Sequence, residues 1–222
     1  MYKPLILNYD TTDDRTQLST YFEDSQVAKI DSIGSQVLEL VKIRNPTRPY
    51  KKNRAFVESL AQKLIDERGP KSEGNWIYYP WTSQLIHVLK EDKFIEVRTN
   101  RNKYKITDEE QQKLSTKVIG IAGISVGRAL AKTAILERIC GEIRIADFDV
   151  LELSNLNRID VGIDELGVNK AISTAREISK LDPFMKVRVF RKGLNEENVN
   201  AFFLEGGKMD LFVEECDSLD IN

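Results

Sequence analysis

Two acidic side chains follow one another where a strand-like run ends. Residues 143 to 158 read IRIADFDVLELSNLNR, so Asp147 and Asp149 come directly after apolar residues, and a polar segment ending in Arg158 follows. Two carboxylates this close repel each other unless water or a ligand lies between them. The stretch therefore fits either a ligand site or a strand that enters a solvated loop, and the surrounding sequence has to decide between the two.

A glycine-containing turn lies upstream of the two aspartates. In GIAGISVGR (120–128), Gly123 and Gly127 flank a turn whose backbone amides, at the start of a helix, would face an anion. The three glycines here do not have the spacing of the dinucleotide fingerprint G-x-G-x-x-G. Asp147 nevertheless comes twenty residues after Gly127, where an acid usually receives the hydroxyls of a ribose. The alternative for this turn is packing without a ligand.

Strands and helices alternate regularly from residue 117 onward. The expected strands are 117–124, 142–147, 185–190 and 209–215, and the expected helices are 126–140, 167–180 and 195–204. Alternation at this spacing is typical of βαβ units and a parallel sheet. Such sheets bind ligands at the carboxyl ends of their strands, which is where Asp147, Asp149, Ser125 and Asp217 are expected.

The first half of the chain mixes helix and strand. Residues 53–69 predict a helix that packs its Phe56, Leu60 and Leu64 on a local core, so that Leu60→Asp is strongly destabilising. Segments 75–81 and 93–99 are predicted as strands. Thr107 and Glu110 have the spacing of a capping box and therefore begin a helix. The basic stretch 42–54 is either a solvated loop or a phosphate-seeking patch. The predicted architecture is α/β: a small α+β domain (1–115), then a Rossmann-like, mainly parallel sheet with flanking helices (116–222), incomplete at its C-terminal end.

Composition narrows the functional classes. The chain has 222 residues, 41% of them hydrophobic and 31% charged, and a net charge of −2 that gives no reason to expect nucleic acid or a membrane as a partner. It contains no run long enough for a transmembrane helix and no signal-like start, so we expect a cytoplasmic protein whose Cys140 and Cys216 are reduced thiols. A single histidine, His87, leaves almost no material for a zinc tetrad or a Ser-His-Asp triad, and we expect it to be structural.

The second half of the chain resembles the ThiF/MoeB/HesA superfamily, the bacterial relatives of ubiquitin-activating enzymes. The resemblance covers roughly residues 98–222. It rests on segments that occur in the family's order: Asp147-Phe148-Asp149, Ser154-Asn155-Leu156-Asn157-Arg158, Gly167-Val168-Asn169-Lys170-Ala171, Leu181-Asp182-Pro183 and Glu214-Glu215-Cys216-Asp217-Ser218. The SNLNR block with its downstream G-x-x-K is the specific part of this pattern.

The resemblance implies an adenylating enzyme that uses ATP and Mg²⁺. Members of the superfamily activate a carboxylate, usually a protein C-terminus, by attack on the α-phosphate of ATP with release of pyrophosphate. By resemblance, Asp147 holds the ribose, Arg158 and Lys170 bind the phosphates, and Asp217 places Mg²⁺. The remaining nucleotide-binding positions would be the turn residues Gly123, Ser125 and Gly127 and the uncharged hydrogen-bonding side chains of Asn155 and Asn157.

A further match implies a homodimer. Arg98-Thr99-Asn100-Arg101-Asn102 resembles the R-Y-x-R-Q segment of MoeB-like proteins, in which the second arginine reaches the ATP site of the partner subunit. Arg101 would be that arginine, and with Arg158, Lys170 and Asp217 it completes the expected catalytic set. The partners implied are a nucleotide and the C-terminus of a small carrier protein. On sequence alone, a solvated arginine pair at this place is the alternative.

Several positions depart from the family pattern. Ile124 and Ser125 stand where small glycines are usual, and Ile124 is expected to crowd an approaching phosphate. Ser218 and Glu215 also differ from the usual residues. Because the chain stops shortly after Asp217, we expect an N-terminal fragment that binds ATP weakly and does not turn over, taken from the subgroup in which a nitroreductase-like domain follows. Two other functions stay open: a nucleotide- or NAD(P)-binding module without adenylating activity, and a structural domain that has lost its ligand.

Overall fold

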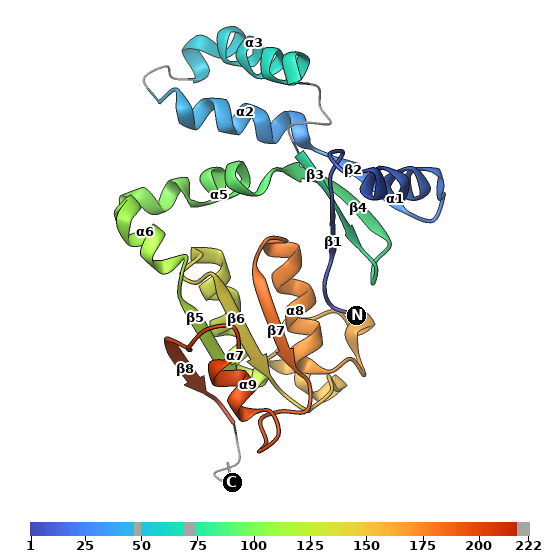
Figure 1. Ribbon diagram of the computed structural model, residues 1–222, viewed down its shortest axis with the longest axis vertical. Coiled ribbons are helices and arrows are strands. Elements are labelled where there is room, and N and C mark those ends of the chain that lie inside the picture. Colours follow the sequence, from blue (N-terminus) through green and yellow to red (C-terminus); the bar gives the residue numbers. More distant parts are fainter. Residues whose placement is uncertain (47–49, 69–73, 217–222) are drawn as a thin grey trace. The chain divides into compact units, whose positions relative to one another are not determined.

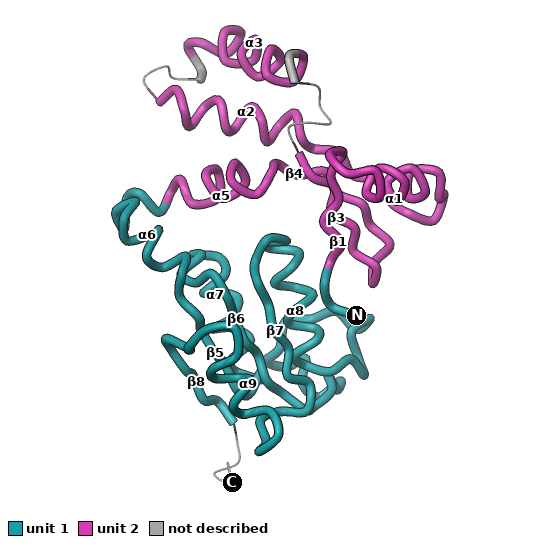
Figure 2. The backbone as a smooth tube through the Cα atoms, in the orientation of Figure 1, with its two compact units in different colours: residues 1–3, 102–222 teal, residues 4–101 magenta. Residues whose placement is uncertain are grey.

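The computed structural model describes residues 1–46, 50–68 and 74–216, with the side chains of residues 50, 51, 67 and 68 outside the description. By their internal contacts the residues form two units, Pro4–Arg101 and a second that joins Met1–Lys3 to Asn102–Asn222 (Figure 2). Helix α6 (Asp108–Leu114) belongs to the second of these units. Each unit has its own four-stranded sheet.

The second unit is built on a parallel sheet (Figure 1). Its strands are β5 (Val118–Ala122), β6 (Glu142–Ala146), β7 (Lys186–Phe190) and β8 (Leu211–Glu214). They lie in the order β7-β6-β5-β8, and every neighbouring pair is parallel. The α/β class predicted from the alternation of strands and helices is confirmed.

Helices cover both faces of this sheet. They are α7 (Ile124–Glu137), α8 (Lys170–Leu181) and α9 (Val199–Leu204), with short 3-10 turns η1 (Asn100–Tyr104), η2 (Leu153–Asn157) and η3 (Ile163–Glu165). Because side chains alternate along a strand, Ile119 and Ile121 pack with α7 and α8 on one face, whereas Val118 and Ala122 pack with Phe202 of α9 on the other. The capping box predicted at Thr107 and Glu110 is confirmed at the start of α6.

The first unit holds a mixed sheet. Its strands β1 (Leu5–Leu7), β2 (Ala28–Asp31), β3 (Gly74–Tyr79) and β4 (Gln84–Leu89) lie in the order β1-β3-β4-β2, and only the β2–β4 pair is parallel. The helices are α1 (Thr12–Glu23), α2 (Ile33–Arg44), α3 (Tyr50–Arg68) and α5 (Glu91–Thr99). His87 is buried in β4, stacks on Trp76 and lies with Nδ1 3.0 Å from Asp31 Oδ1. Burial lowers the pKa of His87, so the neutral ring belongs to this core.

Two predictions for the first unit are wrong. Residues 93–99, predicted as a strand, lie in helix α5, where Phe94 and Val97 are three residues apart and pack on the α2–α3 cluster together. The helix predicted at 53–69 is present, but Phe56 is exposed on it. Its buried contacts come from Val57 and Ala61, and Leu60 is half-buried beside them.

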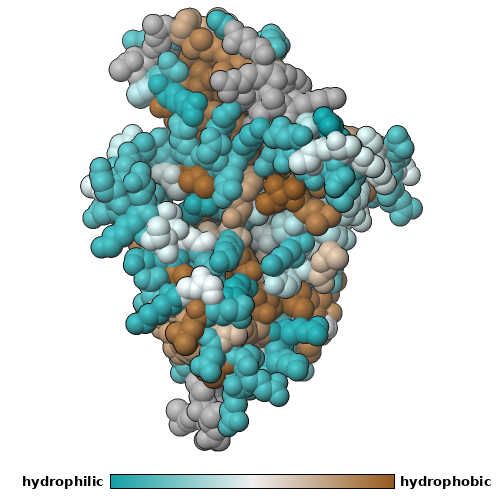
Figure 3. Space-filling view, viewed as in Figure 1, coloured by the Kyte–Doolittle hydropathy of each residue, from teal (hydrophilic) through white to brown (hydrophobic). Residues whose placement is uncertain are grey.

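The surface shown in Figure 3 is mainly hydrophilic, with apolar patches between charged and polar side chains. Across the described residues, no helix combines the length and the apolar character needed to cross a membrane.

Candidate nucleotide site

The strand order creates a switch point at the carboxyl end of β5. Along the chain, β6 and then β7 are added on one side of β5, whereas β8 returns to its other side. Ligands of open α/β sheets bind outside the carboxyl ends of the strands where the order reverses in this way. The residues at this point are the turn after β5, the loop after β6 and the two described residues after β8, Glu215 and Cys216.

Two glycines of the turn after β5 serve different steric needs. Gly123 has φ +84°, and a Cβ on it would lie 2.3 Å from the carbonyl oxygen of Glu215. Gly127 lies one helical turn later, and a Cβ there would lie 2.5 Å from Ile121 Cγ2 of the strand below. The first glycine therefore allows the turn beside the end of β8, and the second allows α7 to pack closely on β5.

The start of α7 offers backbone donors. A helix leaves its first N–H groups without acceptors inside the helix, and those of Ile124, Ser125 and Val126 are in that position. The Ile124 amide donates to Asp147 Oδ2 at 2.7 Å. The amides of Ser125 and Val126 follow it in the same turn, in the arrangement that binds anions at helix N-termini.

The expected obstruction by Ile124 is absent. Its side chain is 1% exposed and belongs to the apolar core beneath α7 and α8. Because this side chain is directed into the core, it does not cover the amides of the turn, and that expectation was wrong. Ser125 is the half-buried side chain of the turn, and its hydroxyl accepts a hydrogen bond from Lys170 Nζ at 3.2 Å.

Asp147 fastens the turn to the loop after β6. Its Oδ2 receives the Ile124 amide, and its Oδ1 receives the Asp149 amide at 2.8 Å. The side chain is buried, and burial raises the pKa of Asp147 above its ordinary value, although these two amides oppose the shift. A carboxylate has about four acceptor positions, so the two backbone bonds leave capacity for further donors.

Lys170 lies against both the turn and the aspartate loop. It is the first residue of α8, where the helix dipole disfavours a cation, and its side chain is only 7% exposed. Asp149 Oδ2 supplies an opposing charge 2.8 Å from Lys170 Nζ. A buried cation with one half-exposed carboxylate and one hydroxyl as partners is well placed to receive an anion.

Asn169 was missed by the sequence analysis. Its Oδ1 caps α8 by accepting the Ile172 amide, and its Nδ2 donates to the carbonyl oxygens of Asp147 and Asp149 at 2.9 and 3.0 Å. This one side chain therefore joins the aspartate loop to the helix that carries Lys170. An asparagine directly before a predicted helix is a capping signal, and that signal could have identified it.

The SNLNR block forms the 3-10 turn η2 and the residue after it. Asn155 is buried, and its side chain accepts the Glu152 amide at 3.0 Å, so part of its hydrogen bonding holds the loop itself. Asn157 and Arg158 are exposed, and Arg158 Nη1 donates to Asn157 Oδ1 at 3.0 Å. The guanidinium thus stands at the surface of this unit, whereas Asn155 anchors the loop beneath it.

The described structure does not test the roles of two expected site residues. Asp217 lies outside the described residues. Arg101 is exposed in η1 and is the last residue of the first unit. Within the described ranges, no three histidine, cysteine or acidic side chains gather as a metal site would require.

The two cysteines differ in their surroundings. Burial raises the pKa of Cys140 to about 12, which makes it a poor nucleophile at neutral pH, whereas Cys216 is exposed.

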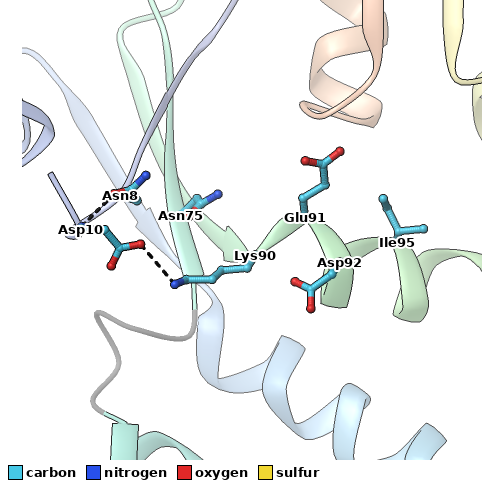
Figure 4. Close-up of a pocket in the computed structure, with 7 residues that line it drawn as sticks. All are labelled: Asn8, Asp10, Asn75, Lys90, Glu91, Asp92 and Ile95. Atoms are coloured by element: carbon cyan, nitrogen blue, oxygen red, sulfur yellow. Dashed lines mark hydrogen bonds and ion pairs between the residues drawn. The ribbon is translucent and has the colours of Figure 1, made fainter.

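A separate hollow of about 550 Å³ opens in the first unit (Figure 4). Its lining residues are Asn8, Asp10, Asn75, Lys90, Glu91, Asp92 and Ile95. The lining holds three carboxylates and one lysine, Lys90, whose Nζ lies 3.5 Å from Asp10 Oδ2. This charge balance disfavours a polyphosphate, so the glycine turn of the second unit remains the candidate nucleotide site.

Comparison with known proteins assigns the second half of the chain to a family. Residues 98–222 match the ThiF family. The chain is 43% identical over 171 residues to the uncharacterized protein MT1398 of Mycobacterium tuberculosis (strain CDC 1551 / Oshkosh), covering 75% of this chain and 24% of that protein. It is 35% identical over 89 residues to the adenylyltransferase and sulfurtransferase MOCS3 of Xenopus laevis, covering 39% of this chain and 19% of MOCS3.

A solved structure shares the fold and was determined with a nucleotide. The E. coli tRNA N6-threonylcarbamoyladenosine dehydratase TcdA, in complex with ATP, superposes with a TM-score of 0.51 at 25% identity. The match covers 59% of this chain and 53% of TcdA. The chain therefore spans about a quarter or less of the two curated relatives and about half of TcdA. The family match covers more than half of the sequence and includes the glycine turn, both aspartates and Lys170, so the chain belongs to the ThiF family.

Proposed function

We propose that this chain contributes the nucleotide site of an enzyme that adenylates a carboxylate with ATP and Mg²⁺. The observation that carries the proposal is the placement of Lys170 beside Ser125 at the glycine turn, at the switch point of a parallel sheet. Family membership supports it, because the ThiF-family relative TcdA binds ATP and the relative MOCS3 is an adenylyltransferase.

The residues at the turn suit a triphosphate. The amides of Ser125 and Val126 and the ammonium of Lys170 offer donors on one side, and the exposed Arg158 offers a planar pair of donors that matches phosphate oxygens. Lys170 would exchange part of its contact with Asp149 for a phosphate oxygen, which releases Asp149 toward solvent. Asp147 would keep the turn in place and use its remaining acceptor capacity for the ribose hydroxyls. Gly123, Gly127, Asn155 and Asn157 complete this proposed nucleotide set.

The proposed reaction places negative charge where these cations lie. A carboxylate oxygen of the acceptor attacks the α-phosphorus, the bond to the β-phosphate breaks, and pyrophosphate leaves with the bonding electrons. Charge then grows on the α-phosphoryl and pyrophosphate oxygens, where fixed donors stabilise the transition state most. Magnesium commonly needs only one or two protein carboxylates in addition to substrate phosphates, and we assign Asp217 to that role. Bound there, Mg²⁺ would neutralise part of the pyrophosphate charge.

We propose a carboxylate at the C-terminus of a small carrier protein as the acceptor, in the cytoplasm, with no nucleic acid or membrane involved. In the whole protein, the ThiF-like part would precede a nitroreductase-like domain. The low coverage of MT1398 by this chain, 24% of its length, is compatible with a long protein of several domains.

We further propose a homodimer with Arg101 near the nucleotide of the partner subunit. One face of α7 supports this: the apolar side chains of Val126, Leu130 and Leu136 are 56, 42 and 55% exposed there. Their positions fall within about a third of the helix circumference at 100° per residue. Exposed apolar side chains gathered on one side of a helix are more typical of an interface than of a solvated surface.

Calorimetry on the intact protein with ATP, NAD and NADP, each with and without Mg²⁺, tests the nucleotide. We expect magnesium-dependent ATP binding that exceeds NAD binding, and Lys170→Ala should abolish most of it. Tight, magnesium-independent NAD binding would favour a dinucleotide module instead. If the protein bound none of these nucleotides, the glycine turn after β5 would have only a packing role.

A further inference from the structure

A cluster of four charged side chains joins helices α7 and α8 and the loop that carries Arg158. Asp160 follows Arg158 by two residues, and its Oδ2 accepts a hydrogen bond from Lys132 Nζ at 2.5 Å. Lys132 also lies 2.7 Å from Glu177 Oε1, and Arg128 pairs with the other oxygen of Glu177. We call Arg128, Lys132, Asp160 and Glu177 the charge cluster.

The charge cluster ties together three segments. Arg128 and Lys132 belong to α7, Glu177 belongs to α8, and Asp160 belongs to the loop that carries Arg158. Each of these segments supplies one proposed phosphate contact: the glycine turn begins α7, Lys170 begins α8, and Arg158 ends the SNLNR block. The cluster is therefore placed to fix the spacing between the three contacts.

The Arg158 loop is anchored on both sides of the exposed guanidinium. Asn155 and Ile159 are buried, and their backbones are joined by the bond from the Ile159 amide to the Asn155 carbonyl at 2.9 Å. Asp160, the residue after Ile159, then holds the loop against α7 through its pair with Lys132. Without Asp160, the buried Ile159 would still keep the loop attached, but the direction in which Arg158 projects would be less constrained.

One N–H group of the charge cluster, on Arg128 Nε, has no hydrogen-bond acceptor among the described residues. Arg128 is 5% exposed, and its Nε finds no hydrogen-bond partner among the described residues, while Asp160 Oδ1 stands 3.8 Å away. That separation exceeds the length of a hydrogen bond. A small approach of the loop toward α7 would satisfy this donor, and the same movement would carry Arg158 along with Asp160.

We infer that Asp160 is a positioning residue for Arg158: through Lys132 and Arg128 it sets the guanidinium where the triphosphate is bound. The inference rests on the proposed function, because it takes Arg158 as a phosphate ligand. Asp160 is 74% exposed, and Lys132 keeps Glu177 as a partner when Asp160 is changed, so the contribution of Asp160 to folding stability should be small. Its effect should therefore be visible in binding rather than in the fold.

A double-mutant cycle on the intact protein with ATP and Mg²⁺ tests the inference. Arg158→Ala should weaken binding by roughly 10- to 150-fold, as expected for a charge-assisted contact. Asp160→Asn should weaken it about 3- to 10-fold in the otherwise unchanged protein, within the range of coupled neighbours. In the Arg158→Ala background, Asp160→Asn should have no further effect, because the residue it positions is gone. Asp160→Glu, which keeps the charge, should restore most of the affinity.

The matched control is Glu137→Gln. It removes one negative charge from the far end of α7 by breaking an exposed pair with Lys105, and it should leave ATP affinity unchanged. If Asp160→Asn weakens binding equally with and without Arg158, or lowers the affinity no more than Glu137→Gln does, the positioning role is overturned while the proposed function stands. If Arg158→Ala itself leaves binding unchanged, the phosphate role of Arg158 fails, and the inference fails with it.

Discussion

At the residue scale, backbone geometry shapes the candidate site as much as side-chain chemistry does. Gly123 has a positive φ, and its missing side chain leaves room for the Glu215 carbonyl. Asp147 and Asn169 then hold the turn, the aspartate loop and the start of α8 to one another through backbone atoms. Lys170 thus projects from a framework that its neighbours have already fixed.

Gly123→Ala should therefore be more harmful than an alanine at another glycine of similar backbone conformation. Gly167 is the control: its φ is +80°, but nothing lies within 4 Å of the position a Cβ would take. Gly167→Ala should cost about 1–2 kcal/mol for the left-handed conformation alone. Gly123→Ala adds a collision with the backbone and should cost more than about 3 kcal/mol. Urea unfolding of both variants measures the difference, and equal losses would contradict the close approach to Glu215.

Residue spacing predicted part of this site but not the directions of its side chains. The alternation of strands and helices predicted that Ser125, Asp147 and Asp149 follow the carboxyl ends of parallel strands, where the structure places them, whereas Lys170 was implied by the family resemblance. The sequence could not show that Ile124 is directed into the core, because the start of a helix presents adjacent residues to different surroundings. It also could not show that the Asp147 carboxylate accepts hydrogen bonds from two backbone amides, those of Ile124 and Asp149. The roles assigned to the site residues, Asp217 and Arg101 among them, remain predictions.

At the element scale, the regularly alternating second half of the chain was predicted better than the first. All four parallel strands were found from the sequence because they alternate with helices, although only β5 and β6 are buried along their whole length and β7 and β8 are largely half-buried or exposed. Helix α5 was predicted as a strand because its short sequence alternates apolar and polar residues over a few positions. Only the packing of Phe94 and Val97 on α2 and α3 reveals the helical period.

The orientation of α3 gives a test of the first unit. Val57 is 1% exposed in the α2–α3 cluster, whereas Phe56 is 41% exposed on the same helix. Val57→Asp buries an unpaired charge and should cost more than about 3 kcal/mol of unfolding free energy. Phe56→Asp should change stability by less than about 1 kcal/mol. Leu60→Asp should fall between the two. Chemical denaturation that ranked Phe56→Asp as the more damaging change would contradict this orientation of α3.

At the scale of the whole molecule, the exposed apolar side chains on one face of α7, Val126, Leu130 and Leu136, bear on the proposed homodimer. Leu130 stands near the middle of that face. If the face forms a homodimer interface, Leu130→Glu should convert a dimer to monomer, because a charge facing its own copy across a twofold axis is doubly unfavourable. Leu204→Glu, on the exposed side of α9, is the matched control and should leave the dimer intact. Light scattering would contradict the proposal if the unaltered protein were a monomer at high concentration.

Pyrophosphate exchange tests the central claim most directly, because it reports formation of an adenylate rather than nucleotide binding alone. With the intact protein, ATP, Mg²⁺ and candidate carboxylate acceptors, we predict that labelled pyrophosphate enters ATP only when the acceptor and Mg²⁺ are present. Lys170→Ala and Arg158→Ala should each suppress the exchange at least about tenfold, as expected for lost charge-assisted contacts, whereas Glu137→Gln should not. Asp217→Asn should spare much of the ATP binding but suppress exchange, because the metal acts mainly as charge develops. Exchange that survives both Lys170→Ala and Arg158→Ala would contradict the assignment of the phosphate site to the glycine turn and its neighbours.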